Sequence, residues 1–266
     1  MKVSILTVAF FILLAIFSDQ VVELVPLKRG EIFSPPSSDH LLGTNDVGED
    51  VLKELIIATK VSVVISLFSA TLSAILGLFI GIFSGYYRSL TAKIFETFTE
   101  VFLVIPTLPL LIVFSFHLPP SIFNIILLIA LFSWPSMARI VRARVFQLRN
   151  SGFVQSAILF GASDFRIILH HIIPNLSEIF FARFSMLVAY SLIVESSLSF
   201  IGLADPTNKS WGAMLHYALK RGAILNDAWW CFVPPGVCIA LLAVSFLLLS
   251  FEFEKVRLTE KFSINK

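Results

Sequence analysis

A half-polar segment, SAILFGASDFRIILHHIIPN from Ser156 to Asn175, contains the residue types that could form a metal site in this chain. Asp164, His170 and His171 are all side chains that bind metals in proteins. Adjacent histidines on a helix point about 100° apart, and Asp164 lies about two turns from His171, so the three side chains cannot converge on one ion. The spacing therefore predicts no metal site and no cofactor bound by this chain.

The same segment contains a candidate nucleophile, Ser163, in the run GASD, with His170 further along. A serine elbow of the G-x-S-x-G type requires glycine where Phe165 stands. An intramembrane serine protease would place its serine at membrane depth, whereas Ser163 lies in a basic stretch between two apolar runs. Because no nucleophile, base or metal-binding residues converge, the sequence predicts that the chain is not an enzyme.

The remaining interpretation of the segment is a docking surface. Between Gly152 and His171 apolar residues are interspersed with polar ones, which suits two short helices broken near Gly161 and lying at the lipid headgroups. Asp164 stands where an N-cap would satisfy free amides of the second helix, and Pro174 would begin the next span with a preset φ angle. Such helices would transmit a push from a soluble partner; the alternative is an amphipathic linker that only rests on headgroups.

Composition places the chain in lipid. Of its 266 residues, 57% are hydrophobic and 14% are charged, and the mean hydropathy is +0.88. Soluble domains average about 25% charged residues. The apolar runs extend along the whole chain, which predicts one all-α, polytopic membrane domain. A net charge of +2 gives no overall field that would attract nucleic acid.

Six segments are apolar enough and close enough to about 20 residues in length to cross a bilayer as helices. They cover about residues 3–25, 57–86, 97–118, 121–138, 178–203 and 231–252. The first could be a signal peptide, but it has no small-x-small cleavage site after Phe17 and continues into VVELV, which favours an uncleaved anchor. We expect residues 1–54 to form this anchor and an extracytoplasmic loop, residues 55–254 the transmembrane core, and residues 255–266 a tail.

Lysine and arginine residues are concentrated on one side of these spans. The positive-inside rule assigns that side, with both termini and the loop predicted at 139–175, to the cytoplasm. The cytoplasmic set comprises Lys2, Arg88, Lys93, Arg139, Arg142, Arg144, Arg149, Arg166, Lys255, Arg257, Lys261 and Lys266, against Lys28, Arg29, Lys53, Lys209, Lys220 and Arg221 outside.

The second span carries a stripe of small residues at every fourth position. In lipid, such stripes allow the backbones of two helices to approach closely. The stripe predicts a tight seam, within the bundle or with a partner; the alternative is chance spacing in a glycine-tolerant span. It comprises Ser69, Ser73, Gly77, Gly81 and Gly85.

Three residues are candidates for a transport pathway. Pro106 and Pro109, in IPTLP, would kink the third span because each proline removes an intrahelical hydrogen bond. Loose packing without a role is the alternative. Glu195 is a carboxylate well inside a span, and such groups usually face the protein interior or a cavity. It would either line the substrate path or make a structural hydrogen bond between helices.

ATP binding has one weak candidate. Gly43 and Gly48 have the spacing of a phosphate-binding loop, but Glu49 and Asp50 follow where that loop needs lysine and then serine or threonine. Acidic residues would repel phosphate, so the chain is not expected to bind ATP by this route.

The half-polar segment resembles the cytoplasmic loop of the inner-membrane permeases of binding-protein-dependent ABC importers. That loop has the pattern E-A-A, three residues, Gly, nine residues, I-x-L-P, and QSAILFGASDFRIILHHIIP aligns with it without a gap. Gln155, Ser156 and Ala157 fall on E-A-A, Gly161 on the glycine and Pro174 on the proline. The departures are Gln for Glu, Ser for Ala, and His for Ile and Ile for Leu before the proline.

Three further stretches resemble the dipeptide, oligopeptide and nickel branch of this family, and within it the second of two permease subunits. They are GASDFRIILHHIIPN, ESSLSFIGL (195–203) followed by SWGAML (210–215), and HLLGTNDVGEDV (40–51). The resemblance covers about residues 40–255.

The resemblance implies a type I importer permease with six transmembrane helices and a coupling helix around Gly161, which includes Ala162, Ser163 and Asp164 and sits in a groove of a separate ATPase. It also implies ATPase subunits that bind ATP and Mg²⁺, a second and different permease subunit, and an extracytoplasmic solute-binding protein. The location implied is a bacterial or archaeal inner membrane, where the chain is multi-pass and contacts lipid.

The cargo implied by the resemblance is a short peptide, with nickel or another small solute as the alternative. Two alternatives come from different classes, a secondary transporter or channel and a polytopic membrane enzyme. A secondary transporter would be expected to show coupling acids at mid-membrane and internal repeats. The sequence shows one acid there and no repeat.

Overall fold

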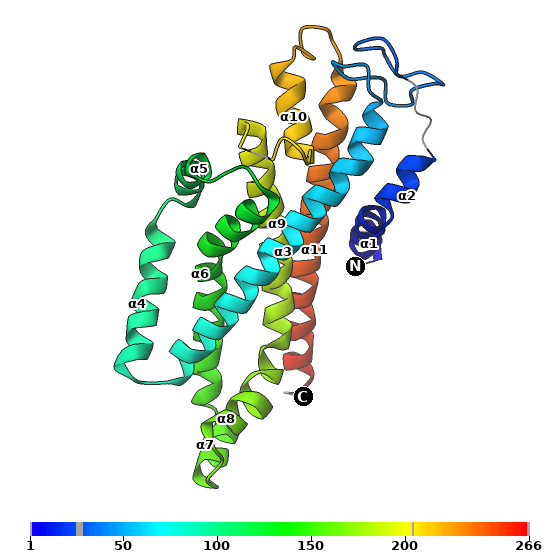
Figure 1. Ribbon diagram of the computed structural model, residues 1–266. Coiled ribbons are helices and arrows are strands. Elements are labelled where there is room, and N and C mark those ends of the chain that lie inside the picture. Colours follow the sequence, from blue (N-terminus) through cyan, green and yellow to red (C-terminus); the bar gives the residue numbers. More distant parts are fainter. Residues whose placement is uncertain (1, 25–28, 204, 265–266) are drawn as a thin grey trace. The chain divides into compact units, whose positions relative to one another are not determined.

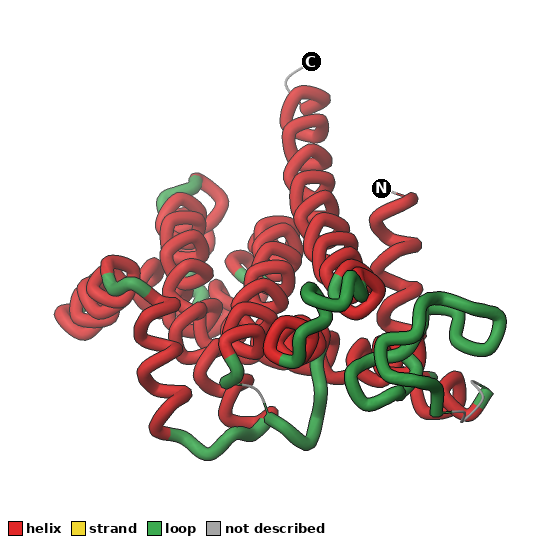
Figure 2. The backbone as a smooth tube through the Cα atoms, turned by 90° about the horizontal axis from the view of Figure 1, so that it is seen from above, coloured by secondary structure: helices red, strands yellow, loops and turns green. Residues whose placement is uncertain are grey.

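The computed structural model describes residues 2–24, 29–203 and 205–264, with side chains described through Phe253 in the last helix. In this part of the chain every regular element is a helix, and loops connect them (Figure 2). Of the basic residues used to predict the orientation, Lys28 and Lys266 lie outside the described residues. The side chains of Lys255, Arg257 and Lys261 are likewise outside the described set.

The helices follow one another along the chain as shown in Figure 1. They are α1 (Lys2–Ile16), α2 (Ser18–Glu23), α3 (Val51–Tyr86), α4 (Leu90–Val104), α5 (Thr107–His117), α6 (Ile122–Arg149), α7 (Gly152–Leu159), α8 (Asp164–Ile167), α9 (Ser177–Ile201), α10 (Trp211–Lys220) and α11 (Val233–Ile264). A π-helical turn, Ile168–Ile172, and a 3₁₀ turn, Pro174–Leu176, connect α8 to α9, and a second 3₁₀ turn, Trp229–Cys231, precedes α11.

Among the described residues, four helical segments are long and apolar enough to cross a bilayer: Val51–Tyr86, Ile122–Arg149, Pro174–Ile201 and Trp229–Phe253. The sharply bent pair α4 and α5 makes five if the two helices form one span. The expected first span is broken at Phe17, and α1 has 15 residues, about 22 Å of helix against about 30 Å of hydrocarbon. The sixth span therefore stays a prediction.

The third span differs from the single kinked helix predicted at 97–118. Helix α4 begins earlier, at Leu90, and ends at Val104, where Ile105 adopts an extended conformation with φ −73° and ψ 129°. A residue that precedes proline is pushed out of the helical region, so Pro106 ends the helix instead of bending it. Pro109 falls in the first turn of α5, where its missing N–H would have no intrahelical partner in any case.

The predicted end of the fourth span, at residue 138, is earlier than the end of the helix, and the cytoplasmic location of residues 139–175 stays a prediction. Helix α6 continues through Pro135 to Arg149, so the basic residues of this stretch lie on a helix that extends beyond the predicted span. The beginning of α3 is also earlier than predicted, at Val51, because the Asp50 carboxylate accepts a hydrogen bond from the backbone N–H of Lys53 at 3.0 Å and caps the helix.

The described chain forms two compact units, and four long helices contribute one part to each. Unit 1 comprises residues 1–69, 108–129 and 188–248, and unit 2 comprises residues 70–107, 130–187 and 249–266. The core of unit 1 contains Trp211, which is fully buried. Its indole N–H donates to the Leu55 carbonyl at 3.3 Å, its backbone N–H donates to Ser62 Oγ at 3.0 Å, and its ring packs edge-on against Phe11.

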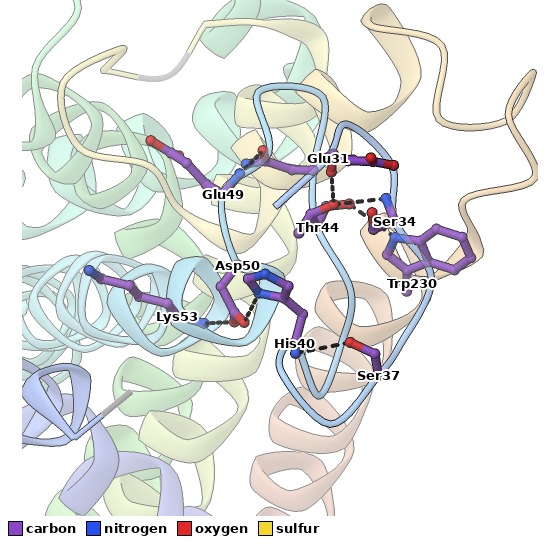
Figure 3. Close-up of polar contacts among 10 residues, drawn as sticks. Glu31, Ser34, Ser37, His40, Thr44, Glu49, Asp50, Lys53 and Trp230 are labelled. Atoms are coloured by element: carbon purple, nitrogen blue, oxygen red, sulfur yellow. Dashed lines mark hydrogen bonds and ion pairs between the residues drawn. The ribbon is translucent and has the colours of Figure 1, made fainter. Parts of the chain in front are cut away.

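The stretch before α3, predicted to be an extracytoplasmic loop, is a loop over the described residues 29–50, and side-chain hydrogen bonds hold it together (Figure 3). The Thr44 hydroxyl donates to the Glu31 carbonyl at 2.5 Å and accepts from the Ser34 N–H at 2.8 Å, while the Trp230 indole donates to the Thr44 carbonyl at 3.0 Å. His40 and Asp50 are both buried, with 2.9 Å between His40 Nδ1 and Asp50 Oδ2. This loop is thereby fixed to the first turn of α3.

Candidate functional site

The segment that links α7 to α8 is broken by Gly161, as the sequence predicts. Gly161 has φ +79°, in the left-handed region that favours glycine. Its N–H donates to the Ile158 carbonyl at 3.0 Å, and the Ala162 N–H donates to the Ala157 carbonyl at 3.0 Å. This pair of bonds is a Schellman motif, which satisfies the last carbonyls of α7 and closes the helix at a defined residue. The break is therefore rigidly specified by local sequence.

Helix α8 is capped by Ser163 and not, as predicted, by Asp164. Ser163 has an extended backbone and its Oγ accepts a hydrogen bond from the Arg166 N–H at 3.4 Å. Asp164 is the first residue of the helix, and its carboxylate accepts a hydrogen bond from the Tyr86 hydroxyl at 2.9 Å. Serine and aspartate are equally good caps, so neighbouring candidates could not be separated without knowledge of Tyr86.

Large apolar side chains surround the break and are uncovered in this chain. Leu159 is 86% exposed, Phe160 92% and Phe165 76%. Val154 of α7 and Ile167 of α8, by contrast, are fully buried. Figure 1 shows α7 and α8 next to each other at the end of α6. An exposed apolar group of this kind marks a surface that contacts either another protein or the membrane.

The other residues aligned with the loop pattern make local contacts. The Gln155 amide donates to the Arg149 carbonyl at 2.9 Å, and the Ser156 hydroxyl donates to the Gly152 carbonyl at 2.9 Å. Ala157 is half-buried. Pro174 is the first residue of the 3₁₀ turn that leads into α9, as expected for a residue that starts a span with a preset φ.

The stripe of small residues on α3 lies against α6 in unit 2. A Cβ atom on Gly77 would be 2.6 Å from Met137 Cβ, one on Gly81 would be 2.7 Å from the Ala138 carbonyl oxygen, and one on Gly85 would be 2.7 Å from the Arg142 carbonyl oxygen. The Ser73 hydroxyl donates to the Ala130 carbonyl at 3.2 Å. Ser69, the stripe residue in unit 1, is fully buried. Three glycines, spaced four residues apart on α3, thus allow the backbones of α3 and α6 to approach each other closely.

Glu195 is fully buried in unit 1 within a cluster of serines. Its carboxylate accepts hydrogen bonds from the Ser199 hydroxyl at 2.6 Å, the Ser196 hydroxyl at 3.3 Å, and the Ser210 hydroxyl. The Ser210 oxygen in turn accepts from the Ala213 N–H and caps α10. The geometry matches the structural alternative of the sequence analysis, a hydrogen-bonded link between α9 and α10. The pathway role of Glu195, like those of Pro106 and Pro109, stays a prediction.

Removal of the Glu195 carboxylate is expected to destabilise unit 1. Glu195→Leu leaves three buried hydroxyls without their acceptor, and each such group costs about 1–3 kcal/mol. Glu195→Gln keeps one acceptor oxygen and should be the milder variant. The thermal unfolding midpoint in detergent measures the difference; equal midpoints for Glu195→Leu and the wild type would contradict the structural role.

Unit 1 also contains a cavity of about 660 Å³ that the sequence analysis did not identify. It lies between the start of α3 and the loop after α9, where Lys209 Nζ is 2.8 Å from Glu54 Oε1 and 3.9 Å from Glu49 Oε2. Burial alone would lower the pKa of Lys209, but the two carboxylates outweigh burial and raise it. The residues that line the cavity are Arg29, Glu49, Asp50, Lys53, Glu54, Ile57, Val61, Pro206, Thr207, Asn208 and Lys209.

Comparison with known families decides what kind of protein carries these features. The family model described as "Binding-protein-dependent transport system inner membrane component" matches residues 77–255. The chain belongs to this family. The matched range includes α4 to α9, and with them the α7–α8 segment, most of α11 and the Glu195 cluster.

Individual relatives of this inner membrane component have names that assign them to the transport of peptides, oligopeptides or glutathione. A Brucella suis protein named as a peptide transport system permease is 34% identical over 218 residues, which is 82% of this chain and 72% of that protein. The oligopeptide transport system permease protein OppC of Bacillus subtilis is 30% identical over 209 residues, 78% of this chain and 68% of its own. The glutathione transport system permease protein GsiD of Escherichia coli is 33% identical over 215 residues, 80% and 70% respectively.

The family confirms the resemblance found in the sequence. The chain is a multi-pass membrane component of a transport system that depends on a binding protein. A transport component matches the expectation that the chain is not itself an enzyme.

Proposed function

We propose that this chain is the permease subunit of an ATP-driven importer of short peptides and that the α7–α8 segment docks onto a separate ATPase. The observation that carries the docking role is the exposure of Leu159, Phe160 and Phe165 around a helix break closed by a Schellman motif. Burial of a rigid, apolar protrusion of this kind in a groove on a soluble partner is more favourable than its exposure to water.

The partners follow from this role. The ATPase subunits bind ATP and Mg²⁺ and supply the energy. A second, different permease subunit completes the membrane channel, and an extracytoplasmic solute-binding protein delivers the cargo. In this arrangement the α7–α8 segment and both termini are cytoplasmic, which accords with the positive-inside distribution of lysine and arginine.

A short peptide is the proposed cargo because the similar proteins of Brucella suis and Bacillus subtilis are named for peptide or oligopeptide transport, and that of Escherichia coli is named for glutathione, itself a tripeptide. Glu195, Pro106 and Pro109 are the proposed pathway residues. The proposal for Glu195 is supported by the position of its carboxylate inside α9, in addition to the structural link that it makes to α10. Pro106 lies at the break between α4 and α5, and Pro109 lies in the first turn of α5.

Mild-detergent purification of the tagged chain from its native membrane tests the assembly, with mass spectrometry of the proteins that accompany it. We expect an ATPase and a second permease to be recovered in a fixed ratio to this chain. Recovery of a folded chain without an ATPase would contradict the proposal and favour a secondary transporter. Uptake of labelled trialanine against ⁶³Ni²⁺, in cells with and without the chain, then distinguishes peptide from nickel import.

A further inference from the structure

The α7–α8 segment, called the docking segment from here on, makes one hydrogen bond to a distant part of the chain that is not needed to cap its helices. The carboxylate of Asp164, an exposed residue at the start of α8, accepts a hydrogen bond from the hydroxyl of Tyr86 at 2.9 Å. The two residues are 78 positions apart in the chain. Because Ser163 already caps α8, the Asp164 carboxylate is free to make this longer-range contact.

Tyr86 is in a position to transmit displacement from α8 to the transmembrane helices. It is the last residue of α3 and is 1% exposed. The guanidinium of Arg149, the last residue of α6, lies over its ring at 5.1 Å from the centroid. Gly85, the residue before Tyr86, and Gly81, one turn further back along α3, pack against the backbone of α6. The ring therefore sits where the ends of α3 and α6 meet the first turn of α8.

We infer that Tyr86 is a positioning residue that couples movement of the docking segment to α3. The inference rests on the proposed function, since it presumes that an ATPase moves α8. When α8 shifts, the hydroxyl–carboxylate bond draws the end of α3 with it, and the glycine seam carries α6 along. Without the bond, α8 still presents its apolar surface to the ATPase but no longer holds α3.

The mechanism separates docking from transmission, and this separation can be measured. The Tyr86→Phe variant keeps the buried ring and its contact with Arg149 and loses the hydroxyl only. We expect the variant to retain its ATPase on purification and to hydrolyse ATP in the assembled complex. Uptake of labelled trialanine should fall about tenfold, the factor that corresponds to loss of one hydrogen bond to a charged acceptor.

Matched variants isolate the bond. Tyr87→Phe removes a hydroxyl from the next residue, for which the described part of the chain shows ring contacts with Phe83 and Tyr86 only, and should leave uptake unchanged. Asp164→Asn keeps an acceptor oxygen and should retain most uptake, whereas Asp164→Ala should match Tyr86→Phe. The double variant Tyr86→Phe/Asp164→Ala should be no worse than either single variant, because both remove the same interaction.

Two results would overturn the inference. One is wild-type uptake by Tyr86→Phe with its ATPase still bound. The other is loss of the ATPase on purification of both Tyr86→Phe and Asp164→Ala, which would mean that the hydrogen bond is needed for docking itself. Because Asp164 is exposed, misfolding of Asp164→Ala would not account for that result. If no ATPase co-purifies with the wild-type chain, or if the wild-type chain imports no trialanine, the proposed function itself is contradicted. That outcome is visible without any of the variants.

Discussion

Gly81→Leu is expected to leave almost no folded chain in the membrane. A side chain at this position meets the Ala138 carbonyl oxygen and Val141 Cβ at 2.7 Å. One of these atoms belongs to backbone, so α6 cannot yield without moving as a whole. Even Gly81→Ala should cost about 1–3 kcal/mol, the usual range for an overpacked site. The measurements are the yield of monodisperse chain in mild detergent and its thermal unfolding midpoint.

Gly236 offers a matched control on another transmembrane helix. It lies in α11, and a Cβ there would meet nothing within 4 Å. Gly236→Ala and Gly236→Leu should therefore fold at wild-type yield, with the alanine variant equal or slightly more stable because alanine favours helix. Equal yields for Gly81→Leu and Gly236→Leu would show that the α3–α6 seam does not require close approach.

Gly161→Asp is expected to abolish uptake while the chain still inserts and folds. The position has φ +79° and no atom within 4 Å of an added Cβ, so the backbone conformation and not space limits substitution. Aspartate and asparagine both tolerate left-handed backbone better than other residues. The variant therefore places a charge among Leu159, Phe160 and Phe165 without a large cost in folding. Co-purification of the ATPase and trialanine uptake report the effect.

Gly161→Asn separates charge from shape, since its side chain has the same size as that of aspartate. We expect Gly161→Asn to retain the ATPase and a substantial part of uptake. For Gly161→Asp, both ATPase recovery and uptake should be at least about tenfold lower than for Gly161→Asn, because an unpaired charge would lose its water in an apolar contact. Similar behaviour of the two variants would mean that the backbone conformation matters and that the surface at the break is not covered by an apolar groove.

The features that the sequence predicted well are those decided within a few residues. The break at Gly161 follows from a glycine placed where a Schellman motif closes α7, and all the atoms involved lie between Ala157 and Ala162. The seam on α3 follows from spacing along one helix, since every fourth residue shares a face. The spacing does not identify α6 as the helix that packs there.

The errors have a common origin in contacts between residues far apart in the sequence. Ser163 and Asp164 are equivalent caps until Tyr86 engages the carboxylate of the second. The pattern of basic residues after position 138 marks a side of the membrane, not an end of a helix, so the prediction placed the end of α6 too early. The charged cavity of unit 1 depends on Lys209 reaching Glu54, 155 positions earlier.

The π-helical turn between α8 and α9 has a consequence for the rotational phase of the docking surface. In this turn the Ile173 N–H donates to the Ile168 carbonyl, five residues back, at 2.9 Å. Compared with a continuous α-helix, the turn accommodates one extra residue, and one residue corresponds to about 100° of rotation about the axis. The azimuth at which Phe165 leaves α8 is thus shifted, relative to α9, from the azimuth that a continuous α-helix would give it. A chain with this turn can keep its transmembrane packing while the orientation of the surface it offers to a partner is tuned separately.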